Sequence, residues 1–187
     1  MVMAKAPTES IDLPSQEPML AAVGRGIQAF ASVETAIGFC FASMMEPGDR
    51  SNAIVILEAA RHIETKMRIV NAIADRSLTD EKLRKRWASL KNKIKRRTDV
   101  RHKLAHWTVG LWPGARSAED AKKWKIALVP PMISSAYFPV MWGKPGDSDE
   151  KPIFIDQLET FHAKCNELFG QLVAFSDAIK EAKRDGK

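Results

Sequence analysis

The stretch that decides the fold is 155–183, which reads IDQLETFHAKCNELFGQLVAFSDAIKEAK. Its apolar residues recur at alternating three- and four-residue steps, the spacing that gathers side chains on one side of an α-helix. The spacing therefore predicts a long helix that buries one face. The predicted core positions of this helix are Leu158, Phe161, Cys165, Leu168, Leu172, Phe175 and Ile179.

Three earlier segments have the same period and predict three more helices, at about 18–45, 51–76 and 79–106. The turn at 46–49 ends the first, so the second is expected to return antiparallel to it. The expected core positions are Val23, Ile27, Phe30, Ile37, Phe41 and Met44 in the first, Ile56, Ala60, Ile63, Met67 and Val70 in the second, and Leu83, Trp87, Leu90 and Ile94 in the third.

The spacing of apolar residues changes between the third and the last predicted helix. Residues 107–112 and 124–129 predict two strands, and Pro130, Pro131 and Pro139 then prevent a long regular element. We therefore expect an all-α antiparallel bundle of four to five helices, with a Trp-rich β-hairpin and loop insertion at about 107–151. Residues 1–18 are polar and proline-punctuated and predict a disordered tail, which leaves 19–187 as a single helical domain.

Composition is that of an ordinary soluble globular chain, with 45% apolar and 28% charged residues among 187. Cys40 and Cys165 lie in apolar helical patterns, which predicts buried thiols and no disulfide framework. The apolar stretch 19–45 contains Arg25 and Glu34, so we expect a core helix and no membrane span. With no apolar signal segment, a cytoplasmic location is expected.

Charge is concentrated in the third predicted helix. The whole chain has 29 Lys and Arg against 23 Asp and Glu, a net charge of +6 that favours polyanionic partners when it is clustered. The cluster predicts an RNA-binding face, although such runs are often only solvated. Its candidate RNA-binding residues are Lys93, Lys95, Arg96, Arg97 and Lys103. The tryptophans of 107–142 either stack on bases or, as we favour, cover the end of the bundle.

Arg101 stands where the third helix calls for an apolar residue, because steps of seven lead from Trp87 to Ile94 and then to Arg101. Glu34 occupies the matching place in the first helix. A charge that points inward needs a partner, so these two residues are expected to form a partly buried pair. The pair either fixes helix register alone or supports a functional site.

His106 follows Arg101 by five residues, which turns it about 140° away on a straight helix, but an unwinding final turn would let the two converge. A neutral imidazole takes the proton of a ribose 2′-hydroxyl, and a guanidinium binds charge developing on phosphate. Alternatively, His106 only opposes the helix dipole and packs beside Trp107. His102 and His106 also have zinc-ligand spacing, but no HExxH glutamate and no nearby cysteine accompany them, so no metal or other cofactor is expected.

The segment Val100-Arg-His-Lys-Leu-Ala-His-Trp107 resembles the Rx4-6H signature of the HEPN superfamily, with Rx4H spacing. The order of parts is also similar over about 19–183: an apolar helix with an inward acid, a second helix, a basic helix that ends in the motif, and a closing helix. Two positions depart from the frequent pattern, since His102 replaces an asparagine and Trp107 replaces a glycine.

The resemblance implies a helical bundle that dimerises around two motifs and cleaves RNA without a metal, in toxin–antitoxin, defence or RNA-processing systems. Carried onto this chain, Arg101 would bind the scissile phosphate, His106 would be the general acid and base, Glu34 would orient Arg101, and His102 would assist. RNA, a second copy and an antitoxin protein are the expected partners. The alternative is a non-catalytic helical module that binds RNA or an acidic protein.

Overall fold

A computed structural model describes residues 14–45, 50–112, 125–130 and 151–186. The chain divides into two compact units, one made of 22–105 and 156–187 and the other of 1–21 and 106–155. The boundary between the two units falls inside the first helix, between residues 21 and 22. It also falls at the end of the helix before the hairpin, between residues 105 and 106. Of the tail predicted to be disordered, 1–18, residues 1–13 lie outside the described residues, as do the loop 113–124 and the proline-containing segment 131–150. The prediction is wrong for Glu17 and Pro18, which belong to the first helix.

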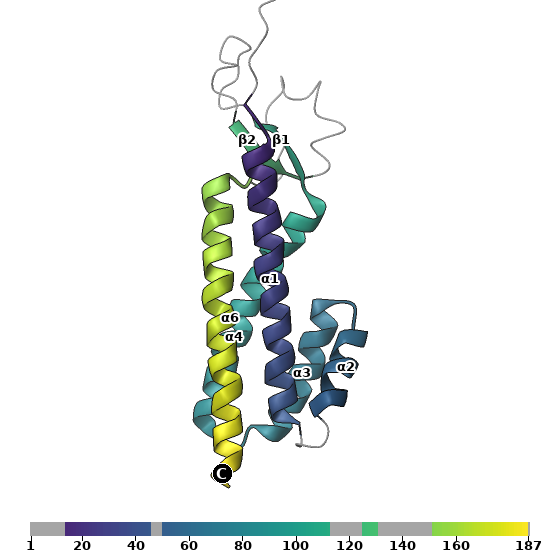
Figure 1. The fold of residues 1–187 in the computed structure, drawn as a ribbon, viewed down its shortest axis with the longest axis vertical. Coiled ribbons are helices and arrows are strands. Elements are labelled where there is room, and N and C mark those ends of the chain that lie inside the picture. Colours follow the sequence, from purple (N-terminus) through teal and green to yellow (C-terminus); the bar gives the residue numbers. More distant parts are fainter. Residues whose placement is uncertain (1–13, 46–49, 113–124, 131–150, 187) are drawn as a thin grey trace, which may run out of the picture. The chain divides into compact units, whose positions relative to one another are not determined.

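The described elements confirm an all-α fold with a small hairpin before the last helix (Figure 1). In chain order they are α1 (Glu17–Met44), α2 (Arg50–Ala59), α3 (Ile63–Ser77), α4 (Glu81–His106), β1 (Thr108–Trp112), β2 (Lys125–Val129) and α6 (Ile155–Arg184).

Helices α1 and α6 run parallel in the larger unit. The Cys40 thiol donates to the Leu172 carbonyl at 3.3 Å, and the buried hydroxyls of Ser43 and Ser176 lie 2.7 Å apart. Near the other end of the contact, Arg25 pairs with Glu159. The three pairs are separated by 132, 133 and 134 residues, and a nearly constant separation means that the two helices point the same way.

Helix α4 runs antiparallel to both. Its Trp87 ring stacks on Phe175 near the end of α6, with centroids 5.7 Å apart and planes 16° apart. At the other end, Leu104 approaches Gly26 and Phe161. All seven core positions that the sequence predicts in the last helix are buried, as are Trp87, Leu90 and Ile94 of α4. The predicted core is therefore confirmed for α6, and for α4 except at Leu83, which is only half-buried.

Three helical glycines meet different surroundings. A Cβ at Gly24 or Gly170 would have no atom within 4 Å, whereas a Cβ at Gly26 would lie 3.0 Å from Leu104 Cδ1 and 3.3 Å from Phe161 Cδ1. Gly26 thus permits the close approach of α1 to α4 and α6. The other two glycines only leave the helix backbone more free in the unfolded chain.

Alanine at Gly24 or Gly170 is expected to raise the free energy of unfolding by about 0.5–1 kcal/mol each, because alanine loses less backbone entropy in a helix. The measurement is urea unfolding followed by circular dichroism. Gly26→Ala is the matched control: its methyl group must displace Leu104, so no comparable gain is expected. A gain at Gly26 equal to the other two would contradict the close packing.

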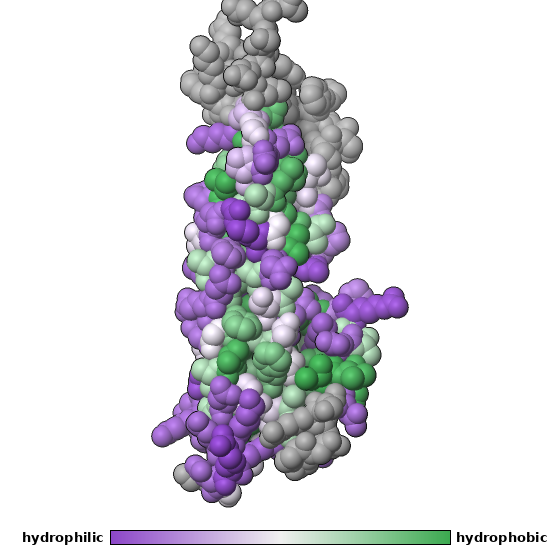
Figure 2. Space-filling model, viewed as in Figure 1, coloured by the Kyte–Doolittle hydropathy of each residue, from purple (hydrophilic) through white to green (hydrophobic). Residues whose placement is uncertain are grey.

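The second predicted helix is wrong as a single element, because the chain breaks at 60–62 into α2 and α3. His62, the residue before α3, has an extended backbone with φ −104° and ψ 135°. Of the five core positions expected in 51–76, only Val70 is buried, and Ile56 is 54% exposed. The break starts a new helical phase, so one continuous period does not describe both helices. Figure 2 shows the resulting apolar surface over α2.

Helix α3 runs antiparallel to α4. The Trp87 indole donates to Asn71 Oδ1 at 3.0 Å, and Arg84 Nε donates to the Leu78 carbonyl at 2.6 Å. Since α4 is antiparallel to α1, α3 points the same way as α1. Of the two helices that replace the predicted second helix, only α2 returns antiparallel to α1, as expected (Figure 1). This reversal brings side chains of α3 to the outer side of α1.

The predicted core face of α1 is partly wrong. Phe30, Ile37, Phe41 and Met44 are buried, but Ile27 is 44% exposed and Val23 is half-buried. Small residues such as Ala22, Ala29 and Ala36 take the inner positions instead, because they allow neighbouring helices to approach. Among the described residues, α1 is long and apolar enough to cross a membrane by length and composition alone, and 61% of that apolar stretch is buried in the fold.

The smaller unit contains the predicted hairpin. Strands β1 and β2 are antiparallel, with Thr108 opposite Val129 and Trp112 opposite Lys125. Ile153 extends the pairing through two backbone hydrogen bonds with Leu128, of 2.8 and 3.0 Å. Both strands therefore lie where the change of period predicts them.

Both cysteines are free and buried, as the sequence predicts. Burial raises the pKa of the Cys40 thiol to about 12 and that of Cys165 to about 11. The thiols stay protonated at neutral pH and act as packing groups, because the thiolate is the reactive form.

Candidate functional site

The candidate site lies at the C-terminal end of α4. Asp80 starts this helix by accepting a hydrogen bond from the Lys82 backbone N–H at 2.8 Å. The buried stripe of Trp87, Leu90 and Ile94 continues to Leu104, which is also buried. Packing along this stripe holds α4 against the bundle almost to its last residue.

Arg101 lies on that stripe, between Ile94 and Leu104, and is half-buried. The inward position expected from steps of seven is thus met only in part. Within the part of the chain that the structure describes, its guanidinium forms no ion pair and no hydrogen bond. Five donors are therefore held close to the protein surface without a carboxylate to neutralise them.

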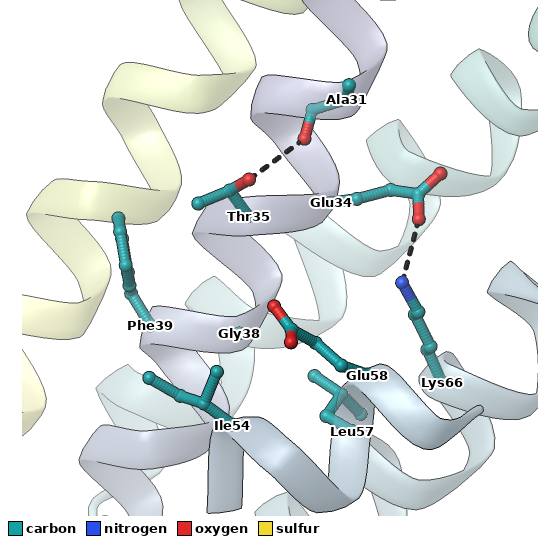
Figure 3. A pocket seen from close by; sticks show the side chains of 9 residues that line it. All are labelled: Ala31, Glu34, Thr35, Gly38, Phe39, Ile54, Leu57, Glu58 and Lys66. Atoms are coloured by element: carbon teal, nitrogen blue, oxygen red, sulfur yellow. Dashed lines mark hydrogen bonds and ion pairs between the residues drawn. The ribbon is translucent and has the colours of Figure 1, made fainter. Parts of the chain in front are cut away.

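The expected partner of Arg101 is wrong. Glu34 pairs with Lys66 instead, with Nζ and Oε2 3.0 Å apart and side-chain exposures of 25% and 17% for the acid and the base (Figure 3). Because α3 starts anew after the break at 60–62, Lys66 reaches the outer side of α1, where Glu34 lies. Glu34 therefore cannot be assigned the role of orienting Arg101.

His102 and His106 are both exposed. Helix α4 stays helical through His106, so the unwinding that would turn His106 toward Arg101 does not occur. In a regular helix, five residues separate the directions of two side chains by about 140°. No group of three or more His, Cys, Asp or Glu side chains within residues 14–45, 50–112, 125–130 and 151–186 could hold a metal ion.

The five candidate RNA-binding residues do not share one face of α4. Lys93 is half-buried and donates to Gln171 Oε1 of α6 at 2.8 Å. Arg97 is half-buried toward the same helix, where its charge opposes the rise in the pKa of the Cys165 thiol. Lys95 and Arg96 are exposed, and Lys103 is half-buried. The charge run thus wraps around the helix, and only part of it faces solvent.

A groove between α3 and α4 adds two basic residues, Arg84 and Lys91, that were not among the candidate RNA-binding residues. Two adjoining cavities, of about 360 and 330 Å³, share Asn71 and Lys91 in their walls. Lys91 precedes Lys95 by four residues, so the two lie on one side of α4, and this spacing is the signal that would have found it. The groove is mixed in charge, with basic residues Arg84, Lys91 and Lys95 and acidic residues Glu64, Asp75 and Asp99.

Comparisons of this chain with protein-family models, with curated proteins and with solved structures found no significant match.

Proposed function

We propose that the protein is a metal-independent endoribonuclease of the HEPN type. One observation supports the proposal above the others: a half-buried arginine, Arg101, that has no carboxylate partner in the described residues and lies in a strongly basic helix. A guanidinium in this position binds a phosphate through paired N–H donors. His102 and His106 of the same segment provide imidazoles, the side chains best suited to proton transfer near neutral pH.

The proposed reaction is attack of a ribose 2′-hydroxyl on the neighbouring phosphorus. A P–O2′ bond forms and the P–O5′ bond breaks, which leaves a 2′,3′-cyclic phosphate and a 5′-hydroxyl end. His106 takes the proton of the 2′-hydroxyl, and a second imidazole or water protonates O5′. Arg101 binds the negative charge that grows on the phosphate oxygens. His102 assists, while Glu34, which pairs with Lys66, has no part in the reaction.

A homodimer completes the proposal. Since the directions of Arg101 and His106 differ by about 140° on one helix, a second copy of α4 would place an arginine and a histidine from different chains at one phosphate. Exposed Lys95 and Arg96 would hold the RNA backbone. In this form the protein acts in the cytoplasm as a toxin or defence component, with an antitoxin protein as its partner.

The second candidate is a non-catalytic helical module that binds RNA or an acidic protein. The observation that favours it is the divergence of Arg101 and His106 along a regular helix. Both candidates bind polyanions in a salt-dependent way, so binding alone does not separate them.

Cleavage separates the two candidates. The full chain, incubated with a mixed set of structured and single-stranded RNAs in excess EDTA, is expected to produce fragments with 2′,3′-cyclic phosphate ends, because no step of the proposed reaction uses a metal. End-group analysis of the fragments is the measurement. Cleavage that stops when EDTA is added, or binding without cleavage across the whole set, would reject the ribonuclease in favour of the binding module.

A further inference from the structure

A cavity of about 360 Å³ lies between α1, α2 and α3, away from the end of α4. Its wall includes five apolar or glycine positions that leave room for an aliphatic group: Ala31, Gly38, Phe39, Ile54 and Leu57. The volume falls in the range of small-ligand sites. A Cβ at Gly38 would meet no atom within 4 Å, so the absence of a side chain there keeps the cavity open.

The remaining charged wall is acidic on balance. Glu34 is neutralised by Lys66 at 3.0 Å, but Glu58 forms no ion pair or hydrogen bond in the described part of the chain. Two carboxylates against one ammonium give the wall a net charge of −1, in a chain whose net charge is +6. In Figure 3 the Glu58 carboxylate extends from α2 across the cavity toward Gly38, so it faces any occupant.

These features select the chemistry of an occupant. A carboxylate or phosphate would meet two acids and is disfavoured, whereas an ammonium or guanidinium would gain Glu58 as a partner. The apolar wall favours an aliphatic chain behind the cation, and the Phe39 ring, which is 41% exposed, offers it a face to cover. Neither the RNA proposal nor α4 is needed for this site.

We propose that the α1–α2–α3 cavity is a binding site for an organic cation on an apolar chain, with Glu58 as the principal counter-charge. The cation is either a free aliphatic amine or the side chain of a lysine in a partner protein. Both sources present an ammonium group at the end of an aliphatic chain, so they share one chemistry and differ in the peptide attached to the lysine.

The test uses n-hexylammonium with the full, ¹⁵N-labelled chain and follows the backbone amide of Gly38 by NMR. Saturable shifts are expected at Gly38, with n-hexanol at least about fivefold weaker and hexanoate without effect, because only the ammonium pairs with a carboxylate. A capped Leu-Lys-Leu peptide is the second arm. Tighter binding of the peptide identifies a protein side chain as the source, and binding of the amine alone identifies a free amine.

Two variants give effects of opposite sign. Glu58→Gln is expected to weaken n-hexylammonium binding at least about fivefold, since the pairing carboxylate becomes a neutral amide. Lys66→Met removes the cation that competes for Glu34, so this variant is expected to bind n-hexylammonium more tightly. Glu181→Gln, an exposed acid on α6, is the matched control and should change nothing. Equal binding of hexanol and hexylammonium, or equal effects of Glu58→Gln and Glu181→Gln, would overturn the proposal.

Discussion

Replacing Phe175 by alanine is expected to lower the free energy of unfolding by about 3–5 kcal/mol. The side chain is fully buried, its ring stacks on Trp87 with centroids 5.7 Å apart, and the Arg86 guanidinium lies over the ring at 5.6 Å. The truncation removes apolar area from the core and leaves a cavity between α4 and α6 that the packed helices cannot close fully. Urea unfolding followed by circular dichroism measures the loss.

Phe39→Ala is the matched control, because it removes the same ring from a position that is 41% exposed. Its expected cost is about 1 kcal/mol, since much of the ring already contacts water. The difference between the two variants measures the α4–α6 core. If both variants lose the same stability, the Trp87–Phe175 stack is not the centre of the bundle.

Replacing His106 by alanine is expected to slow RNA cleavage by about 100- to 10,000-fold, the usual contribution of a general acid or base. Arg101→Ala is expected to give a comparable loss, and Arg101→Lys should restore little of it, because an ammonium does not provide the paired donors of a guanidinium. The measurement is the single-turnover cleavage rate in EDTA, with circular dichroism confirming that each variant keeps its helices.

Arg96→Ala is the control for simple charge loss. Arg96 is exposed on α4, so its removal is expected to weaken RNA binding at low salt and to matter less as salt increases. The losses at Arg101 and His106 should persist at saturating RNA. Cleavage by His106→Ala at the wild-type rate would remove this histidine from the reaction.

Local periodicity was sufficient for much of the fold. In 155–183 every expected core position is buried, because a long helix that packs along its whole length keeps one phase. The signal for the two strands was equally local, since the alternation of apolar and polar residues and the turn-forming residues on either side lie within a few positions. Arg101 was placed on the inward stripe of α4 for the same reason. These features depend on neighbours in sequence, which the sequence displays directly.

Long-range pairing was not predictable in the same way. The break at 60–62 contains no proline or glycine that would have marked it. After it, α3 presents Lys66 to Glu34, and Ile56 of α2 stays exposed. The partner of a charged side chain depends on which helix packs beside it. An interruption of the helix at 60–62 changes the direction of every side chain that follows it in α3.

The candidate site also has features that the sequence predicts and features that depend on the packing of the helices. The sequence by itself determined that an arginine lies on the buried stripe of a basic helix and that two histidines follow it. Only the tertiary structure decided that Glu34 belongs to a different pair, that the basic residues wrap around α4, and that a cavity opens beside Gly38. The physical reason is that helix phase is a local property, whereas ion pairs and cavities are set by how separate helices meet.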